Sequence, residues 1–180
     1  MVVVLLKCLK CLLLSSILLT AFAACSSEKR NRAQEMALLN EKSKDVEFLK
    51  GKTLHSVDSI LGSDEKKNRI LYVFNYYDCD DCIKKGFKAV EYLDKNRKES
   101  VSVIVSMFQE ITSTQRRSGY RGYIYKDEKD LIRKELKYAP TPMMLILDEE
   151  NRIVDVCIFD FLLGEKDSDD FLEKCLSIKN

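Results

Sequence analysis

The stretch Arg69–Phe87 reads RILYVFNYYDCDDCIKKGF and joins two different patterns. Its first part, Arg69–Tyr77, is rich in β-branched and aromatic residues over the length of a strand. In its second part the apolar residues recur at helical spacing, with charged residues between them. The sequence therefore predicts a strand that runs directly into a helix, with Cys79 and Cys82 at the junction.

Asp78, Asp80 and Asp81 surround the two cysteines. They fall at the cap and in the first turn of the predicted helix, where carboxylates interact favourably with the positive end of the helix. One interpretation is therefore helix capping and surface charge. A second interpretation is that the carboxylates tune the reduction potential of the thiols or select a basic partner, because nearby negative charge raises the pKa of a thiol.

The rest of the chain also alternates between strand and helix patterns. Ser100–Phe108 is nearly all apolar, which is typical of a central strand, and with the first strand and helix it predicts a right-handed βαβ unit. The further predicted elements are a strand at Tyr123–Tyr125, a helix at Asp127–Tyr138, a hairpin of strands at Met143–Asp148 and Arg152–Phe161, and a helix at Asp167–Ile178. Both prolines, Pro140 and Pro142, directly precede the hairpin.

Residues 1–24 have the organisation of a secretion signal, with two lysines ahead of an apolar run and small residues at its end. The run is shorter than the about 20 apolar residues that a membrane-spanning helix needs. Phe22–Cys25, FAAC, resembles a bacterial lipobox, by which the chain is cut before Cys25 and the Cys25 sulfur carries a diacylglycerol. The alternative is an ordinary signal peptide that leaves Cys25 free. Both interpretations place the mature protein outside the cytoplasm, and the lipobox predicts a lipid anchor in the cell envelope, facing the periplasm or the exterior.

The mature chain is long enough for one domain behind a tether. Residues 25–50 are polar and charged, with sparse apolar positions, and they predict the tether, whereas residues 51–180 predict the domain. The formal net charge is +1 and the sequence has no basic stripe, so nucleic acid is not an expected partner.

The sequence holds seven cysteines, of which Cys8 and Cys11 fall within the predicted signal. The mature chain keeps too few cysteines for a large disulfide framework. One close pair and two scattered residues predict a redox pair plus packing residues. Cys157 and Cys175 are therefore expected in the core, with a disulfide between them as the alternative.

From the residues alone, several interpretations of Cys79 and Cys82 stay open. The pair could be a working dithiol, an inert disulfide at a helix start, or part of a thiolate metal site. The only histidine, His55, precedes the first predicted strand, and no metal site is predicted.

Taken together, these features resemble the thioredoxin fold, and more narrowly the membrane-anchored TlpA-like thiol-disulfide oxidoreductases. The pair Cys79 and Cys82 follows an apolar strand at a helix start. Thr141-Pro142 stands before the hairpin, where that family has its cis-proline, and an insert at Gln109–Asp127 precedes the third helix. The resemblance implies an α/β fold in which helices flank a central mixed sheet, with a TlpA-like insertion before the cis-proline loop.

The resemblance also implies a chemistry. Cys79 is the nucleophile, because the unpaired N–H groups of a helix N-terminus stabilise its thiolate, and Cys82 is the resolving thiol. Pro142 in cis holds Thr141 where the Thr141 backbone can pair with an extended client chain. The reaction exchanges electrons with protein thiols and disulfides, uses no organic cofactor, and is recharged by a membrane electron donor.

The chain departs from the family pattern around the pair. Asp80 and Asp81 replace the usual Gly-Pro. Asp78 stands where thioredoxins usually have tryptophan, and Val73 replaces a buried acid. Because the carboxylates disfavour a thiolate and so destabilise the reduced form, we expect a reducing couple. The alternative from another class is a non-catalytic lipoprotein of this fold that serves as a binding module or scaffold.

Overall fold

The computed structural model describes residues 37, 44–62, 69–97, 101–106, 118–160 and 164–178. The predicted signal, the lipobox with Cys25, and residues 109–117 of the predicted insertion lie outside the described residues. The chain divides into two compact units, Met1–Ser43 and Lys44–Asn180, and the fold given below belongs to the second unit.

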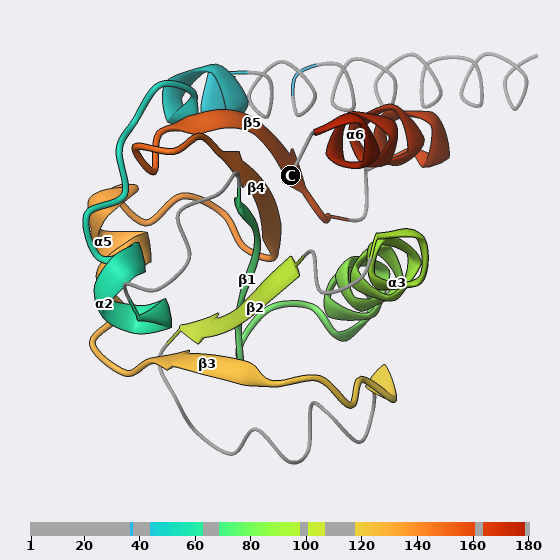
Figure 1. The fold of residues 1–180 in the computed structure, drawn as a ribbon, viewed down its shortest axis with the longest axis horizontal. Helices are drawn as coiled ribbons and strands as arrows, with labels where there is room; N and C mark the ends of the chain where they lie inside the picture. The colour runs from blue at the N-terminus through green and yellow to red at the C-terminus, as the bar shows by residue number, and fades with distance from the viewer. Residues whose placement is uncertain are drawn as a thin grey trace, which may run out of the picture. The chain divides into compact units, whose positions relative to one another are not determined.

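Within the described residues, five strands form one mixed sheet with the order β3-β2-β1-β4-β5 (Figure 1). The strands are β1 (Arg69–Asn75), β2 (Val101–Ser106), β3 (Ile124–Asp127), β4 (Met143–Leu147) and β5 (Ile153–Ile158). β1 and β2 run parallel, as do β2 and β3, whereas β4 is antiparallel to both β1 and β5. The predicted strand-helix-strand unit and the predicted hairpin are confirmed, and together they place β1 at the centre of the sheet.

Helices cover both faces of this sheet (Figure 1). They are α2 (Val57–Leu61), α3 (Asp80–Asn96), α5 (Leu131–Glu135) and α6 (Glu165–Ser177). α3 and α6 pack on one face, whereas α2 and α5 pack on the other. The predicted class, an α/β fold with a central mixed sheet flanked by helices, is confirmed.

The side chains of β1 explain why the sheet has two apolar faces. They alternate along the strand, so Tyr72 and Phe74 face α3 and α6, while Leu71 and Val73 face α2 and α5. All four side chains are buried, and burial of an apolar side chain contributes about 1.5–3 kcal/mol relative to its exposure. Because both faces are covered, the strand is apolar throughout instead of alternating between apolar and polar residues.

Gly86 lets α3 approach β1 closely. The Tyr72 ring, on β1, packs against three other aromatic rings, those of Phe74, Phe87 and Phe159. The Tyr72 hydroxyl donates a hydrogen bond of 3.1 Å to the Ile83 carbonyl oxygen. A Cβ atom at Gly86 would overlap the Tyr72 ring. The missing side chain therefore sets how near the first half of α3 lies to the sheet.

The predicted helix at Asp127–Tyr138 is wrong in its length. Asp127 ends β3, and its carboxylate accepts hydrogen bonds of 2.8 and 2.9 Å from the first N–H groups of α5. Lys137 and Tyr138 have left-handed φ values of 53° and 58°, so the helix has ended before them. Tyr138 is 58% exposed and does not belong to the apolar side of this helix, contrary to the prediction.

Several other boundaries differ from the predictions by a few residues: β3 covers Ile124–Asp127 rather than Tyr123–Tyr125, and β5 covers Ile153–Ile158 within the predicted Arg152–Phe161. β1 ends at Asn75 rather than at Tyr77, because Asn75 begins a hydrogen-bonded turn. α6 begins at Glu165, two residues before the predicted start at Asp167, and its N-cap is Gly164. None of these differences changes the order or direction of the elements.

Candidate redox site

A hydrogen-bonded turn joins β1 to α3. The Asn75 side-chain oxygen accepts from the Tyr77 N–H at 2.9 Å, and the Asn75 carbonyl oxygen accepts from the Asp78 N–H at 3.1 Å. In the other direction, the Asn75 N–H donates to Asp78 Oδ2 at 2.7 Å. Asn75 is buried, so the end of β1 fixes the position of Asp78 and of the cysteine that follows it.

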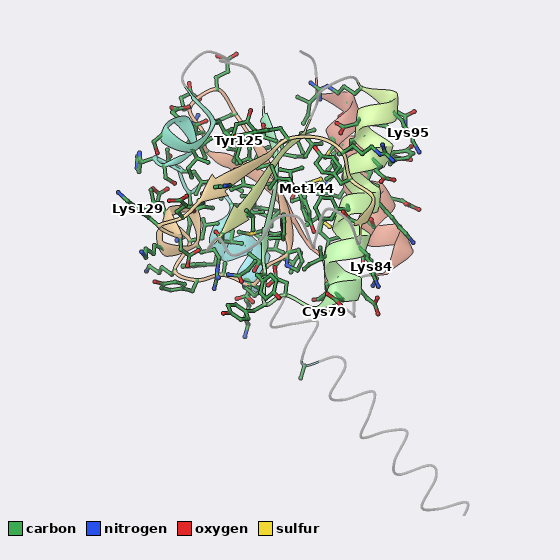
Figure 2. The ribbon with its side chains drawn as sticks, turned by 90° about the horizontal axis from the view of Figure 1, so that it is seen from below. Cys79, Lys84, Lys95, Tyr125, Lys129 and Met144 are labelled. Atoms are coloured by element: carbon green, nitrogen blue, oxygen red, sulfur yellow. A yellow bond between two sulfur atoms is a disulfide. The ribbon has the colours of Figure 1, made fainter. Side chains whose placement is uncertain are left out.

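Cys79 and Cys82 form a disulfide at the start of α3, with a Cα–Cα distance of 5.2 Å. Cys79 is the N-cap residue, and its Sγ accepts a hydrogen bond from the Cys82 N–H at 3.1 Å. Figure 2 shows Cys79 at one end of α3. Cys79 is exposed, whereas Cys82 is only 6% exposed. One half of the disulfide is therefore open to solvent and the other half lies against the core.

The place of Cys79 also favours a thiolate once the disulfide is reduced. The N–H groups in the first turn of a helix have no intrahelical partner, and they carry the positive end of the helix dipole. A sulfur at the N-cap position lies beside these groups and already accepts a hydrogen bond from one of them. Helix N-termini are a known setting for reactive cysteines.

The Thr141–Pro142 peptide bond is cis, as the resemblance predicts. The Thr141 hydroxyl donates a hydrogen bond of 2.8 Å to Asp78 Oδ1. The Pro142 carbonyl oxygen accepts from the Phe159 N–H at 2.8 Å. These contacts hold the loop before β4 against the residue that precedes Cys79. The structure thus brings the cysteine pair and the Thr-Pro loop into one site.

Asp78 differs from the other two aspartates of the motif. It is half-buried and precedes the N-cap, so the prediction that it caps α3 is wrong, because Cys79 takes that position. Burial raises the pKa of the Asp78 carboxyl above its usual value. The hydrogen bonds from Asn75 and Thr141 and the charge of Arg133 act in the opposite direction and only reduce this effect.

Asp80 and Asp81 lie in the first turn of α3 and are exposed. The Asp81 carboxylate forms an ion pair of 3.0 Å with Lys84, and Lys85 donates a hydrogen bond of 3.1 Å to the Asp160 carbonyl oxygen. Both acids therefore have the place that first-turn carboxylates favour at the positive end of a helix. As exposed groups they are screened by solvent more strongly than Asp78.

Cys157 on β5 and Cys175 on α6 are buried in the same apolar cluster, and both are thiols. The alternative of a disulfide between them is therefore not found. Burial raises the pKa of the Cys175 thiol to about 12, so this thiol stays protonated and unreactive near neutral pH. The prediction that both residues serve packing is confirmed.

The remaining predictions concern His55 and metal binding. His55 is exposed, and its backbone N–H donates to the Glu135 carboxylate at 2.9 Å. In the part of the chain that the structure describes, no group of three His, Cys, Asp or Glu residues could hold a metal ion. The same residues contain no helix of the length and apolar character that crossing a membrane requires.

Two residues of the site are not singled out by the sequence pattern, namely Asn75 and Arg133. Asn75 carries a local signal, because Asn and Asp three residues apart at the end of a strand are typical of a side-chain-stabilised turn. Arg133 lies on α5, and its proximity to Asp78 depends on the packing of an element far away in the sequence. No local pattern could have indicated it.

A sheet with the order β3-β2-β1-β4-β5, a cysteine pair at the N-terminus of α3, and a cis-proline before β4 together define a thioredoxin-like fold with a C-x-x-C disulfide. No protein-family model and no curated protein matches the chain.

Solved structures of similar fold include three bacterial proteins. A secreted disulfide oxidoreductase of Mycobacterium tuberculosis, homologous to E. coli DsbE, is 9% identical and matches with a TM-score of 0.48 over 63% of this chain and 84% of its own. A thiol-disulfide isomerase from Corynebacterium glutamicum is 19% identical, with a TM-score of 0.46 over 64% of this chain and 84% of its own. StoA from Bacillus subtilis is 18% identical, with a TM-score of 0.45 over 61% of this chain and 83% of its own. At such identities the partners of those proteins do not carry over to this chain.

Proposed function

We propose that this chain is a thiol-disulfide oxidoreductase that acts outside the cytoplasm and reduces the disulfides of other proteins. The observation that carries this proposal is the setting of Cys79, which is exposed, caps α3, and is bonded to the buried Cys82 beside the cis Thr141–Pro142 peptide. A disulfide that served stability alone would gain nothing from an exposed sulfur at a helix N-terminus.

The reaction is two successive thiol-disulfide exchanges. In the reduced protein, the Cys79 thiolate attacks one sulfur of a client disulfide, the client S–S bond breaks, and one client thiolate leaves. Cys82 then loses its proton and attacks the Cys79 sulfur, which releases the second client thiolate and forms the Cys79–Cys82 disulfide. The client has gained two electrons and takes up two protons. A membrane dithiol donor returns the protein to its reduced form.

Thr141 is suited to hold the client during the first exchange. Within the described residues, neither the N–H nor the C=O group of Thr141 has a backbone partner, because the β1–β4 pairing ends at Val73 and Met143. An extended client segment can pair with these groups, as in other cases in which a peptide adds a strand to a sheet. This pairing would bring the client disulfide to the exposed Cys79.

The reducing direction rests on the charges around the dithiol. Three carboxylates, those of Asp78, Asp80 and Asp81, disfavour a thiolate at Cys79, whereas the N-terminus of α3 favours it. A less stable thiolate makes the reduced form a stronger electron donor. We therefore expect a reduction potential near the about −270 mV of thioredoxin and far from the about −120 mV of a strong oxidase.

The location of the protein rests on residues 1–24, which form the expected signal, and on Cys25, the expected site of the diacylglycerol. An oxidising compartment outside the cytoplasm is where protein disulfides form and persist, so clients are present there. A protein held at a membrane surface is also within reach of a membrane electron donor.

The direct test is to trap the intermediate. Cys82→Ser leaves the nucleophile Cys79 but removes the resolving thiol, so the mixed disulfide with a client should persist. The full-length variant is expressed in the native host, thiols are blocked in acid, and disulfide-linked partners are identified after purification. The double variant Cys79→Ser/Cys82→Ser is the matched control. We expect specific partners only with the single variant; equal capture by both variants would contradict the proposal.

A further inference from the structure

We propose that Asp78 is a positioning residue that holds Thr141, and with it the client-pairing backbone, in register with Cys79. This inference rests on the proposed function, and it assigns to Asp78 a role besides its charge. The Asp78 carboxylate accepts hydrogen bonds from the Asn75 N–H, at the end of β1, at 2.7 Å and from the Thr141 hydroxyl, in the loop before β4, at 2.8 Å.

These hydrogen bonds lie just beyond the point where the backbone pairing of β1 with β4 ends. The antiparallel pairing of β1 with β4 ends at Val73 and Met143. If the register continued for two residues beyond this pair, Asn75 would lie opposite Thr141. Among the described residues, no backbone hydrogen bond joins Asn75 to Thr141, and the Pro142 carbonyl oxygen instead accepts from the Phe159 N–H that follows β5. The Asp78 carboxylate links the two residues instead, because its Oδ2 accepts from the Asn75 N–H and its Oδ1 accepts from the Thr141 hydroxyl.

Asp78 also directly precedes Cys79 in the sequence. The carboxylate therefore links three parts of the site: the end of β1, the loop before β4, and the N-cap of α3. Hydrogen bonds to a charged group are stronger than neutral ones, so this link restrains Thr141 more than a neutral side chain would. Two titratable groups on neighbouring elements interact electrostatically with this carboxylate, namely Arg133 of α5 and Tyr72 of β1.

Thr141→Val removes the hydroxyl and keeps the branched shape, whereas Thr141→Ser keeps the hydroxyl. The first measurement follows the Asp78 carboxyl by carbon NMR during a pH titration of the full chain in its oxidised form, in which Cys79 and Cys82 do not titrate. Because the hydroxyl bonds to the charged carboxylate, its loss in Thr141→Val should raise the pKa of Asp78 by about one unit. Thr141→Ser should not change it.

The second measurement is the reaction of the reduced full chain with a disulfide-bridged peptide. We expect Thr141→Val to lower kcat/KM by about tenfold, mainly through KM, because one hydrogen bond to a charged group is lost. Thr141→Ser should recover most of this loss. The rate at which dithiothreitol opens the oxidised site should fall by less than about twofold, because that reagent has no peptide backbone to pair with Thr141.

Asp78→Asn tests the same hydrogen bond by changing the acceptor instead of the donor. It replaces Thr141→Val as the test variant if the thermal midpoint shows that Thr141→Val is unstable. Combined with Thr141→Val, it should raise KM for the peptide no further than the worse single variant does. An unchanged Asp78 pKa in Thr141→Val, or a changed pKa with unchanged peptide kinetics, overturns the inference alone. A wild type that reacts with the peptide no faster than Cys79→Ser overturns the proposed function and this inference with it.

Discussion

Asp78 directly precedes the exposed Cys79 in the sequence, and its half-buried carboxylate accepts a hydrogen bond from the Thr141 hydroxyl. Asp81 lies in the first turn of α3, but its carboxylate is exposed and paired with Lys84. Solvent screens an exposed charge far more than a buried one. At the scale of single residues, Asp78 should therefore influence the thiolate of Cys79 more strongly than Asp81 does.

This difference leads to a prediction for the reduction potential. Asp78→Asn removes the negative charge, stabilises the reduced form by about tenfold, and so raises the potential by about 30 mV. Asp81→Asn is the matched control and should raise it by less than about 10 mV. The potentials are measured by equilibration with glutathione buffers. A larger shift for Asp81→Asn than for Asp78→Asn, or a fall in potential for Asp78→Asn, would show that this assignment of charge is wrong.

At the scale of elements, the contact of α3 with β1 decides where Cys79 lies. The first half of this helix has no side chain at Gly86, where a Cβ would meet the buried Tyr72 ring. The ring is held by three aromatic neighbours and by its own hydrogen bond, so it cannot move aside at little cost.

Gly86→Ala should therefore destabilise the protein despite the better helix propensity of alanine. The propensity gain is at most about 1 kcal/mol, whereas overpacking a core costs about 1–3 kcal/mol. We expect a net loss of about 1 kcal/mol in the free energy of unfolding by urea. Lys88→Ala, on the exposed side of α3, is the control and should change it by less than about 0.5 kcal/mol. A stabilised Gly86→Ala protein would contradict the packing described.

Asp155 on β5 connects two further elements. Its carboxylate lies 3.3 Å from Lys50, directly after helical residues 44–49, and 2.7 Å from Lys174 of α6. Burial alone would raise the pKa of this carboxyl, but the hydrogen bonds from Lys174 and the Val156 N–H, with the two lysine charges, hold it below its usual value. The ionised form therefore stabilises the folded state.

The pH dependence follows from this sign. Stability from Asp155 is present above the unfolded-state pKa of about 4 and is lost as the pH falls through the lower folded-state pKa. Asp155→Asn should lower the free energy of unfolding by about 1 kcal/mol at pH 7 and by much less at a pH near 2. Urea titrations at both pH values measure the difference. An equal loss at both would mean that packing, and not the charge, accounts for it.

The elements were predictable from the sequence wherever a local pattern of apolar residues shows which side chains are buried. The apolar run of β1, the helical spacing of α3 and the two strands of the hairpin each determine their own structure. The late start of α5, at Leu131 rather than Asp127, is different, because the Asp127 carboxylate accepts hydrogen bonds from the first N–H groups of this helix and apolar spacing does not indicate this. The link from Asp78 to Thr141 joins residues 63 positions apart, so no local pattern contains it.

At the scale of the whole molecule, the proposed anchor makes a separate prediction. If Cys25 carries a diacylglycerol, the mature protein should remain with membranes after a carbonate wash, and its N-terminal peptide should show the added lipid mass. Cys25→Ala should release the protein in unprocessed or soluble form. A wild type whose mature N-terminus is an unmodified residue would contradict the anchor and leave the redox site unaffected.

The central claim is that Cys79 and Cys82 open and close during catalysis. The most direct measurement is the rate at which the full chain, recharged by dithiothreitol, reduces the disulfides of insulin. The wild type should exceed the rate with dithiothreitol alone, and Cys79→Ser should fall to that background. Cys175→Ala, which removes a buried thiol outside the site, should keep at least about half of the activity. A wild type no faster than the reagent alone, or a Cys79→Ser variant as active as the wild type, would contradict the claim.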